Sequence, residues 1–234
     1  VPVAEMPELE RYMLHLLGAL DAELRAAADA FEFNRYARAL TDFCNNDLSA
    51  FFFDIRKDSL YCDAADSPKR RAYRTVLDLL FHALVRWAAP VLVFTAEEVW
   101  AARFPDAGSV HLREWPELPA LADEALAARW QALRGLRAQV LETIEPLRRE
   151  KVLGSGLEAM VAVPAGVQPD VPAADLAELF ITASVTRAQG EGVTVTRTHD
   201  HKCGRCWRHL PEVGEDGALC RRCDGVVAEM EAPA

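Results

Sequence analysis

The chain has 234 residues, 51% of them hydrophobic and 26% charged, which fits a globular protein with room for more than one packing unit. Lys and Arg total 26 against 36 Asp and Glu, so the net charge of −10 excludes a global positive field that attracts polyanions. Any contact with nucleic acid must therefore be local. The longest apolar stretch, residues 79–94, is interrupted by His82, Arg86 and Pro90 and falls short of the roughly 20 residues of a membrane-spanning helix. The chain begins with neither an initiator Met nor a signal-peptide pattern, so we expect a piece of a longer protein.

Apolar side chains at helical spacing predict helices at the start of the chain. Residues 7–30 carry one such stripe, and Pro7 suits the first helical position. Residues 33–44 repeat the pattern with Cys44 in the predicted core, and the polar run 45–47 is expected to weaken the helix.

Two further helices are predicted by their start signals. Ser67 is a good cap and Pro68 a good first-turn residue for a helix that Pro90 should end. Thr95 and Glu98 match a capping box that opens a short helix through Trp100.

The character of the sequence changes in its second half. A long amphipathic helix is predicted from near Leu121, bent by Pro146. Gly154 and Gly156 then break the helical period, and alternating runs at 157–163 and 193–197 predict strands around a helix at 172–180. We therefore expect a mainly α protein with this domain order: a helical bundle at 1–120, a long connecting helix at 121–156, a small α/β unit at 157–198 and a zinc finger at 199–228.

The metal prediction rests on two close cysteine pairs. Cys203 and Cys206 form one C-x-x-C pair and Cys220 and Cys223 the other, whereas Cys44 and Cys62 stand apart. Two such turns can place four thiolates at the corners of a tetrahedron, as one structural Zn²⁺ requires, and they leave no open position for catalysis. Three histidines stand close enough in sequence to replace a thiolate as alternative ligands: His199, His201 and His209.

Cationic and aromatic residues surround the cysteines. Trp207 directly follows Cys206, and several cations are close in sequence, namely Lys202, Arg205, Arg208, Arg221 and Arg222. In one interpretation the cations screen the thiolates and Trp207 covers the small core. In the other, Trp207 stacks on an unpaired base with Arg205 beside it, as in binders of single-stranded nucleic acid.

Several motifs resemble the C-terminal part of bacterial isoleucyl-tRNA synthetase. The helical half is similar to the anticodon-binding domain shared by the isoleucyl, valyl and leucyl enzymes, through NDLS at 46–49, KDSLY at 57–61, Ser67 with Arg70 and Arg71, AP at 89–90 and FTAEEVW at 94–100. The run EKVLGSGLEA at 150–159 and CGRCW at 203–207 resemble the junction and the zinc finger of the isoleucyl enzyme. Gly156 departs from the family pattern, where Ser is frequent, which loosens the expected turn.

The resemblance implies a function. It predicts recognition of the anticodon arm of isoleucine tRNA within a class I ligase that joins isoleucine to its tRNA with ATP during protein biosynthesis. The four cysteines would be zinc ligands, and the expected tRNA-binding residues are Lys202, Arg205, Trp207, Arg208, Arg70 and Arg71. The partners would be isoleucine tRNA and the enzyme's own catalytic and editing domains, in a cytoplasmic monomer without membrane contact. No catalytic residue is predicted, because nothing resembles the H-I-G-H or K-M-S-K-S segments of the family.

Two basic groups have weaker signals. One group lies at the start of the third predicted helix and comprises Lys69, Arg70, Arg71 and Arg74. The other is a stripe of cations along the surface of the long helix. Each is either a solvated helix face or a set of positioning contacts to tRNA phosphates.

Two alternative functions remain. A similar terminal zinc finger occurs in bacterial DNA glycosylases, whose nucleophile is an N-terminal proline. The Pro-Glu-Leu-Pro run at 116–119 lies inside the chain, where the proline nitrogen is an amide, so it predicts a turn before a helix. The second alternative is a zinc-bearing interaction module with no nucleic-acid role, which the charge of −10 favours.

Overall fold

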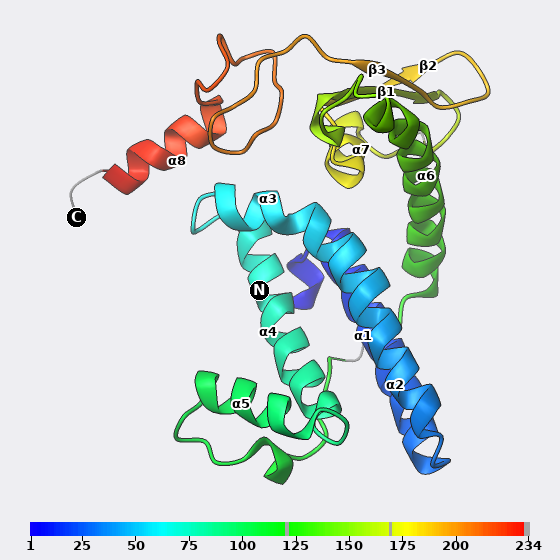
Figure 1. Ribbon diagram of the computed structural model, residues 1–234, viewed down its shortest axis with the longest axis vertical. Coiled ribbons are helices and arrows are strands. Elements are labelled where there is room, and N and C mark those ends of the chain that lie inside the picture. The colour runs from blue at the N-terminus through cyan, green and yellow to red at the C-terminus, as the bar shows by residue number, and fades with distance from the viewer. Residues whose placement is uncertain (120–121, 169, 232–234) are drawn as a thin grey trace. The chain divides into compact units, whose positions relative to one another are not determined.

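The computed structural model describes residues 1–119, 122–168 and 170–231 and is mainly helical (Figure 1). It divides into two compact units. The first comprises Val1–Arg56 and Ala65–Ala127, and the second comprises Lys57–Ala64 and Ala128–Ala234. The short segment 57–64 therefore belongs with the second half of the chain, which its sequence does not indicate.

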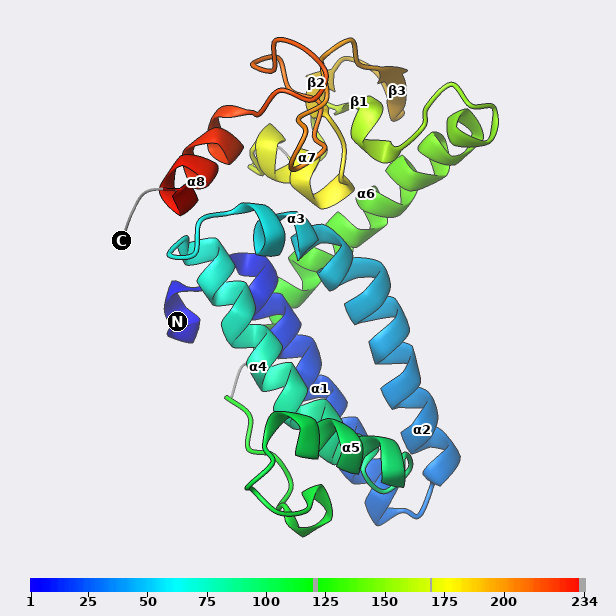
Figure 2. The same cartoon turned by 60° about the vertical axis from the view of Figure 1, so that its left-hand side comes forward.

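Helices build the first unit. Its main α-helices are α1 (Glu8–Asp29), α2 (Phe33–Asp42), α4 (Pro68–Ala88) and α5 (Val93–Arg103), with short 3₁₀ turns at Val3–Glu5 and Val110–Leu112. The predicted helices at 7–30 and from Pro68 to the region of Pro90 are confirmed. Figure 2 shows α1, α2 and α4 running along one another, with α5 at one end of α4.

The stripe on α1 is buried as its spacing predicts. Leu9, Met13, Leu17 and Leu24 are between 0% and 3% exposed. Phe52 and Trp87, from other elements of the unit, are fully buried. Each such side chain contributes about 1.5–3 kcal/mol on leaving water, so this core accounts for the packing of the helices.

The polar run at 45–47 does not weaken the helix as expected. The backbone continues from α2 through a π-helical segment, η2 (Phe43–Phe53), into α3 (Asp54–Cys62). The wider i→i+5 bonding of this segment keeps the chain helical while Phe43, Leu48 and Phe51 turn inward. Cys44, predicted in the core, is half-buried.

One of the two predicted start signals is confirmed in position and the other is wrong. Ser67 is the N-cap residue of α4 and Pro68 lies in its first turn, as predicted, although the Ser67 side chain makes no cap hydrogen bond. Thr95 lies inside α5, whose N-cap is Leu92, so there is no capping box there. Glu98 also lies inside α5 and cannot serve as the second residue of a capping box. The neighbouring Glu97 carboxylate accepts hydrogen bonds from the Ser109 hydroxyl and the Val110 backbone N–H.

The second unit contains most of α6 (Glu124–Arg149) and a three-stranded sheet. The predicted start of this helix near Leu121 lies outside the described residues, and Pro146 lies within its last turn. Strand β1 (Ala159–Pro164) pairs in parallel with β2 (Ser184–Ala188) and antiparallel with β3 (Thr194–Arg197), giving the order β2-β1-β3. Helix α7 (Ala173–Phe180) connects β1 to β2 and lies against the sheet in both views (Figures 1 and 2).

The prediction of the α/β unit succeeds for three of its elements. The strands near 157–163 and 193–197 and the helix at 172–180 are present. Strand β2 was missed because its sequence, SVTRA, has a single buried apolar side chain, Val185. Gly156 lies where a Cβ would come within 3.1 Å of the Ile181 carbonyl oxygen, so glycine suits this close approach.

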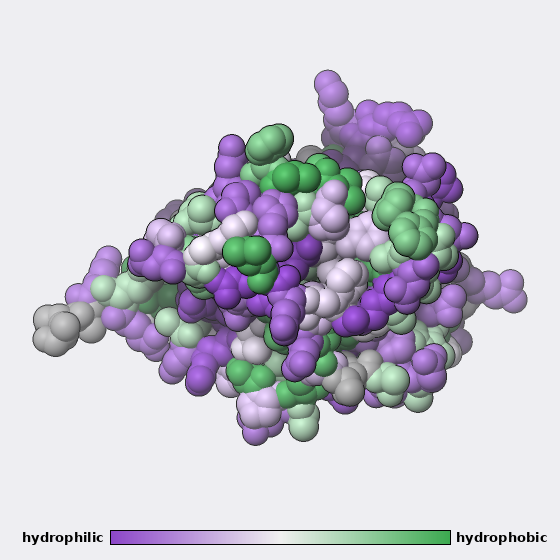
Figure 3. All heavy atoms as spheres, turned by 90° about the horizontal axis from the view of Figure 1, so that it is seen from below, coloured by the Kyte–Doolittle hydropathy of each residue, from purple (hydrophilic) through white to green (hydrophobic). Residues whose placement is uncertain are grey.

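The face seen in Figure 3 carries separate apolar patches among hydrophilic side chains. The most exposed large apolar residues of the first unit are Phe31, Phe33, Phe94 and Leu112. Among the described residues, no helix combines the length and apolar character needed to cross a membrane.

A buried ion pair links α1 to the start of α3. The Arg56 guanidinium donates to both carboxylate oxygens of Glu10 at 2.7 and 2.8 Å. Glu10 is 0% exposed and Arg56 5%, so neither charge has water as a substitute partner. Removing one partner of such a pair is strongly destabilising because the other charge stays buried.

We therefore predict that Glu10→Ala lowers the free energy of unfolding by about 3–5 kcal/mol. Urea denaturation followed by circular dichroism measures the change. Glu5→Ala, at an exposed carboxylate in the first 3₁₀ turn, is the control and should change it by less than about 0.5 kcal/mol. Equal effects of the two substitutions would show that the buried pair has no special role.

Candidate metal centre and nucleic-acid surface

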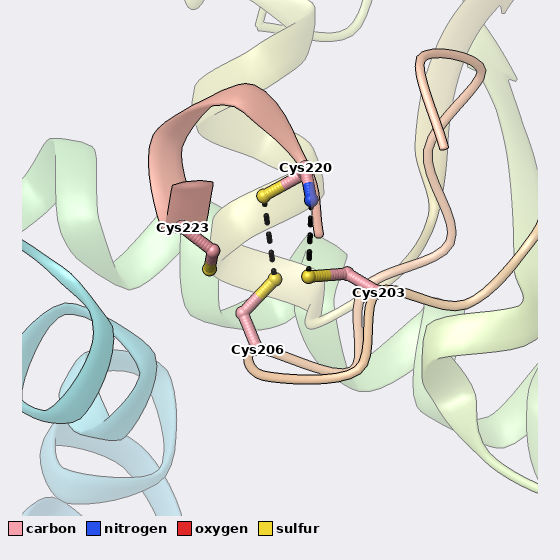
Figure 4. Close-up of side chains that lie close together, drawn as sticks. All are labelled: Cys203, Cys206, Cys220 and Cys223. Carbon is pink, nitrogen blue, oxygen red and sulfur yellow. Dashed lines mark hydrogen bonds between the residues drawn. The ribbon is translucent and has the colours of Figure 1, made fainter. Parts of the chain in front are cut away.

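The four predicted cysteine ligands converge on one point. Cys203 and Cys206 come from one tight turn, Cys220 precedes α8 (Arg221–Glu231), and Cys223 lies in the first turn of that helix. All four are buried, with exposed fractions of 0%, 9%, 1% and 0%. Figure 4 shows their side chains pointing toward a common centre.

The distances between the sulfur atoms fit a tetrahedral metal site. All four Sγ atoms lie within 4.8 Å of one another, and those of Cys206 and Cys220 are 3.9 Å apart. A tetrahedron with Zn–S bonds of about 2.3 Å has edges of about 3.8 Å between its sulfur atoms. Four thiolates at this spacing match the soft-donor preference of zinc, and they fill all four positions of a tetrahedral ion.

Backbone hydrogen bonds preorganise the ligands. The Cys220 N–H donates to the Cys203 sulfur at 3.3 Å (Figure 4), and the Trp207 N–H donates to the Cys203 carbonyl at 3.0 Å. Burial by itself raises the pKa of the Cys203 thiol, but neighbouring backbone N–H groups, first that of Cys206, outweigh it and lower the pKa to about 6. Burial raises the pKa values of Cys206 and Cys220, so a metal ion must displace protons from these thiols.

Gly204 allows the finger to close. A Cβ on Gly204 would lie 2.4 Å from the Gly217 carbonyl oxygen, which no side chain tolerates. The Gly204 N–H donates to the Ala218 carbonyl at 3.1 Å, and Gly217 itself has φ +93°, a conformation that favours glycine. The two cysteine turns can therefore approach because both positions are glycines.

The three alternative histidine ligands do not join the cysteines. Within the described part of the chain, the cluster of possible metal ligands contains only the four thiols. His209 uses Nδ1 in a 2.8 Å hydrogen bond with the Asp200 carbonyl, and His201 Nδ1 lies 3.6 Å from a carboxylate oxygen of Asp216. His199 is exposed.

Trp207 is exposed beside the metal centre. Its side chain is 62% exposed, and the Lys202 ammonium lies 5.9 Å from its ring centroid, within the range of a cation–π contact. Its backbone has φ 65°, which is unfavourable for a bulky residue. The hydrogen bonds from Trp207 N–H to Cys203 and from Cys203 N–H to the Arg208 carbonyl, at 3.0 and 2.9 Å, hold this turn.

Arg205 is engaged with the protein itself. Its guanidinium donates to the Cys62 carbonyl at 2.7 Å and the Tyr61 carbonyl at 3.1 Å, and it lies 3.6 Å from the Cys223 sulfur. The acceptor carbonyls belong to the segment 57–64, which lies in the same unit as the finger. No motif or residue spacing in the sequence predicts this contact.

The remaining predicted tRNA-binding residues belong to two different units. Lys202 is exposed and Arg208 half-buried in the finger, next to Trp207 in sequence. Arg70 and Arg71 lie in the first turns of α4 in the other unit, where Arg71 is exposed and Arg70 half-buried. Each unit thus presents its own basic residues.

Two family models match the chain. The model described as the anticodon-binding domain of tRNA ligase matches residues 10–163. The chain belongs to this family. A second model, described as the zinc finger found in FPG and IleRS, matches residues 200–226 and so includes all four cysteines. The anticodon-binding match separates the chain from the glycosylase alternative, which shares the finger alone.

Several similar proteins are named isoleucine–tRNA ligase. That of Zymomonas mobilis is 57% identical over 239 residues, covering 98% of this chain and 25% of the relative. Those of Mesorhizobium japonicum and Gluconobacter oxydans are each 46% identical and cover 94% and 97% of this chain. The chain spans about a quarter of the length of these relatives. The resemblance to isoleucyl-tRNA synthetase is thereby confirmed, and the helices of the structure confirm the mainly α fold.

We predict that Cys220→Ser abolishes zinc binding, because a serine hydroxyl is a harder and much less acidic donor than a thiol. Zinc content after gel filtration, measured by plasma mass spectrometry, reports the loss. Cys44→Ser is the matched control and should retain the zinc of the unchanged chain, since Cys44 is outside the cluster. Full zinc content in Cys220→Ser would contradict the assignment.

Proposed function

We propose that this chain recognises the anticodon arm of isoleucine tRNA as part of an enzyme that joins isoleucine to that tRNA with ATP. The observation that carries the proposal is the exposed Trp207, held beside a four-cysteine centre in a chain of the anticodon-binding family. The names of the relatives support isoleucine as the amino acid. In this proposal the catalytic and editing chemistry belongs to other parts of a monomeric cytoplasmic enzyme.

The metal has a structural role in this proposal. One Zn²⁺ bound by Cys203, Cys206, Cys220 and Cys223 has no open position, so it fixes the loop that presents Trp207. The strained backbone of Trp207 supports a functional role, because an unfavourable φ persists only where the surroundings enforce it. A solvent-exposed indole on an ordered loop is suited to stacking on an unpaired base.

Cationic residues would complete the surface. We propose that Lys202 and Arg208 contact phosphates next to the stacked base, and that Arg70 and Arg71 at the start of α4 contact the tRNA backbone from the first unit. Arg205 was expected to bind tRNA beside Trp207. Because its guanidinium donates to the Tyr61 and Cys62 carbonyls, we propose that it acts by orienting the loop of Trp207.

We predict that Trp207→Ala weakens binding to isoleucine tRNA by about 1–3 kcal/mol, the value of one stacked base. Fluorescence anisotropy with labelled tRNA measures the affinity. The zinc content should not change, because Trp207 is exposed and is not a ligand. Trp207→Phe, which keeps a stacking face, is the matched control and should retain most of the affinity. Loss of zinc in Trp207→Ala would show that the indole supports the finger instead.

We also predict that tRNA binding weakens steeply as salt rises, because phosphate contacts release counterions. A titration between 50 and 300 mM KCl with isoleucine and valine tRNAs tests both the charge dependence and the specificity. Preference for isoleucine tRNA with a clear salt slope is expected. Salt-independent binding, or none to either tRNA, would favour an interaction module without a nucleic-acid role.

A further inference from the structure

The two cysteine pairs carry an arginine at the same position. Arg205 precedes Cys206 and Arg222 precedes Cys223, so each occupies the place directly before the second cysteine of its pair. Both side chains reach the same short segment, residues 58–63, which belongs to the same compact unit as the finger. Binding of a metal ion by four thiolates does not by itself require this convergence.

Arg222 makes the stronger of the two contacts. Its guanidinium donates to both carboxylate oxygens of Asp58 at 2.7 and 2.8 Å and to Asp63 at 2.9 Å. The other Asp63 oxygen accepts a hydrogen bond from the Ser59 hydroxyl. Both carboxylates, first Asp58, raise the pKa of Arg222. Asp58 and Asp63 are therefore partners of the finger.

Arg205 contacts the end of α3. The Tyr61 and Cys62 carbonyls that accept its hydrogen bonds belong to the last two residues of that helix. The final carbonyls of a helix lack intrahelical donors and carry the negative end of its dipole. A guanidinium at this position donates hydrogen bonds to these carbonyls and places a positive charge at the negative end of the helix dipole.

The finger also covers Cys62. This thiol is 7% exposed and packs in the same cluster as the four cysteine ligands and Val213. Cys62 is not one of the cluster's metal ligands. The exposure of the Cys62 thiol therefore indicates whether the finger is packed on residues 58–63.

We propose that Arg205 and Arg222 form a metal-dependent clamp that seats the finger on residues 58–63. Each arginine lies between two ligands, so one ion bound by all four thiolates fixes both guanidinium groups relative to each other. Without the ion, small cysteine-rich fingers lose their fold, and the two arginines lose this common frame. Zinc binding and seating of the finger are thus one coupled event, independent of any tRNA contact.

Arg221 provides a control within the same turn. Arg221 directly precedes Arg222 and is also an arginine. Its side chain is 88% exposed and forms an ion pair with Glu212 at 2.8 Å. Within the described residues, the hydrogen bonds of Arg221 go to Glu212 and not to 58–63. Substituting either arginine removes one positive charge from this turn, but only substitution of Arg222 removes a contact to 58–63.

The test is the alkylation rate of Cys62 in the zinc-loaded 234-residue chain, measured with iodoacetamide under native conditions by peptide mass spectrometry. Cys44, half-buried and outside the cluster, is the internal reference. We expect Arg222→Ala to keep its zinc and to raise the Cys62 rate at least about tenfold, which corresponds to 1.4 kcal/mol of lost seating. Arg221→Ala should leave the rate unchanged.

A substitution on the other partner keeps the test decisive if Arg222→Ala loses its metal. Asp58→Asn lies far from the ligands in sequence and removes the charge that Arg222 contacts, so it should raise the Cys62 rate with zinc retained. Chelation of zinc from the unchanged chain should raise it as well. The clamp is disproved if Cys62 stays protected in Asp58→Asn or after chelation, or if Arg221→Ala exposes it as much as Arg222→Ala does.

Discussion

The convergence of four cysteine sulfurs within 4.8 Å is the constraint on which the finger depends. Residues 199–220 form no helix or extended strand, and only a single bridge between Lys202 and His209 orders them as sheet. Backbone donors aimed at Cys203 and the paired glycines bring the thiols together, and a metal ion would turn that arrangement into a rigid one. The exposed position of Trp207 follows from this rigidity, because the residue is bonded to the same turn.

Much of this organisation can be predicted from sequence because it is local. The stripe on α1 and the break after Ala88 follow from helical spacing and from proline chemistry, which need no knowledge of distant residues. The cysteine pairs are similarly informative, because two residues between ligands is what a tight turn needs for one ion. Family membership then adds what spacing alone cannot, namely an anticodon-binding role.

The failures share a different cause: tertiary context. Strand β2 has little apolar alternation and is extended because β1 offers it a parallel partner. The π-helical continuation through 45–47 survives its polar residues because Phe43, Leu48 and Phe51 are buried. Arg205 and Arg222 contact residues more than a hundred positions away, with sequence separations of 143 and 164, so no local pattern could assign their partners. A guanidinium predicted to bind an external ligand was already bound by the protein.

The central claim is that a metal-ordered loop presenting Trp207 recognises tRNA. Its most direct test is the affinity of the intact chain for isoleucine tRNA, measured at constant ionic strength before chelation, after chelation and after readdition of zinc. Ordering of the loop by zinc predicts that chelation weakens binding by at least about tenfold, or 1.4 kcal/mol, and that zinc restores it. The same affinity in all three states would contradict the claim.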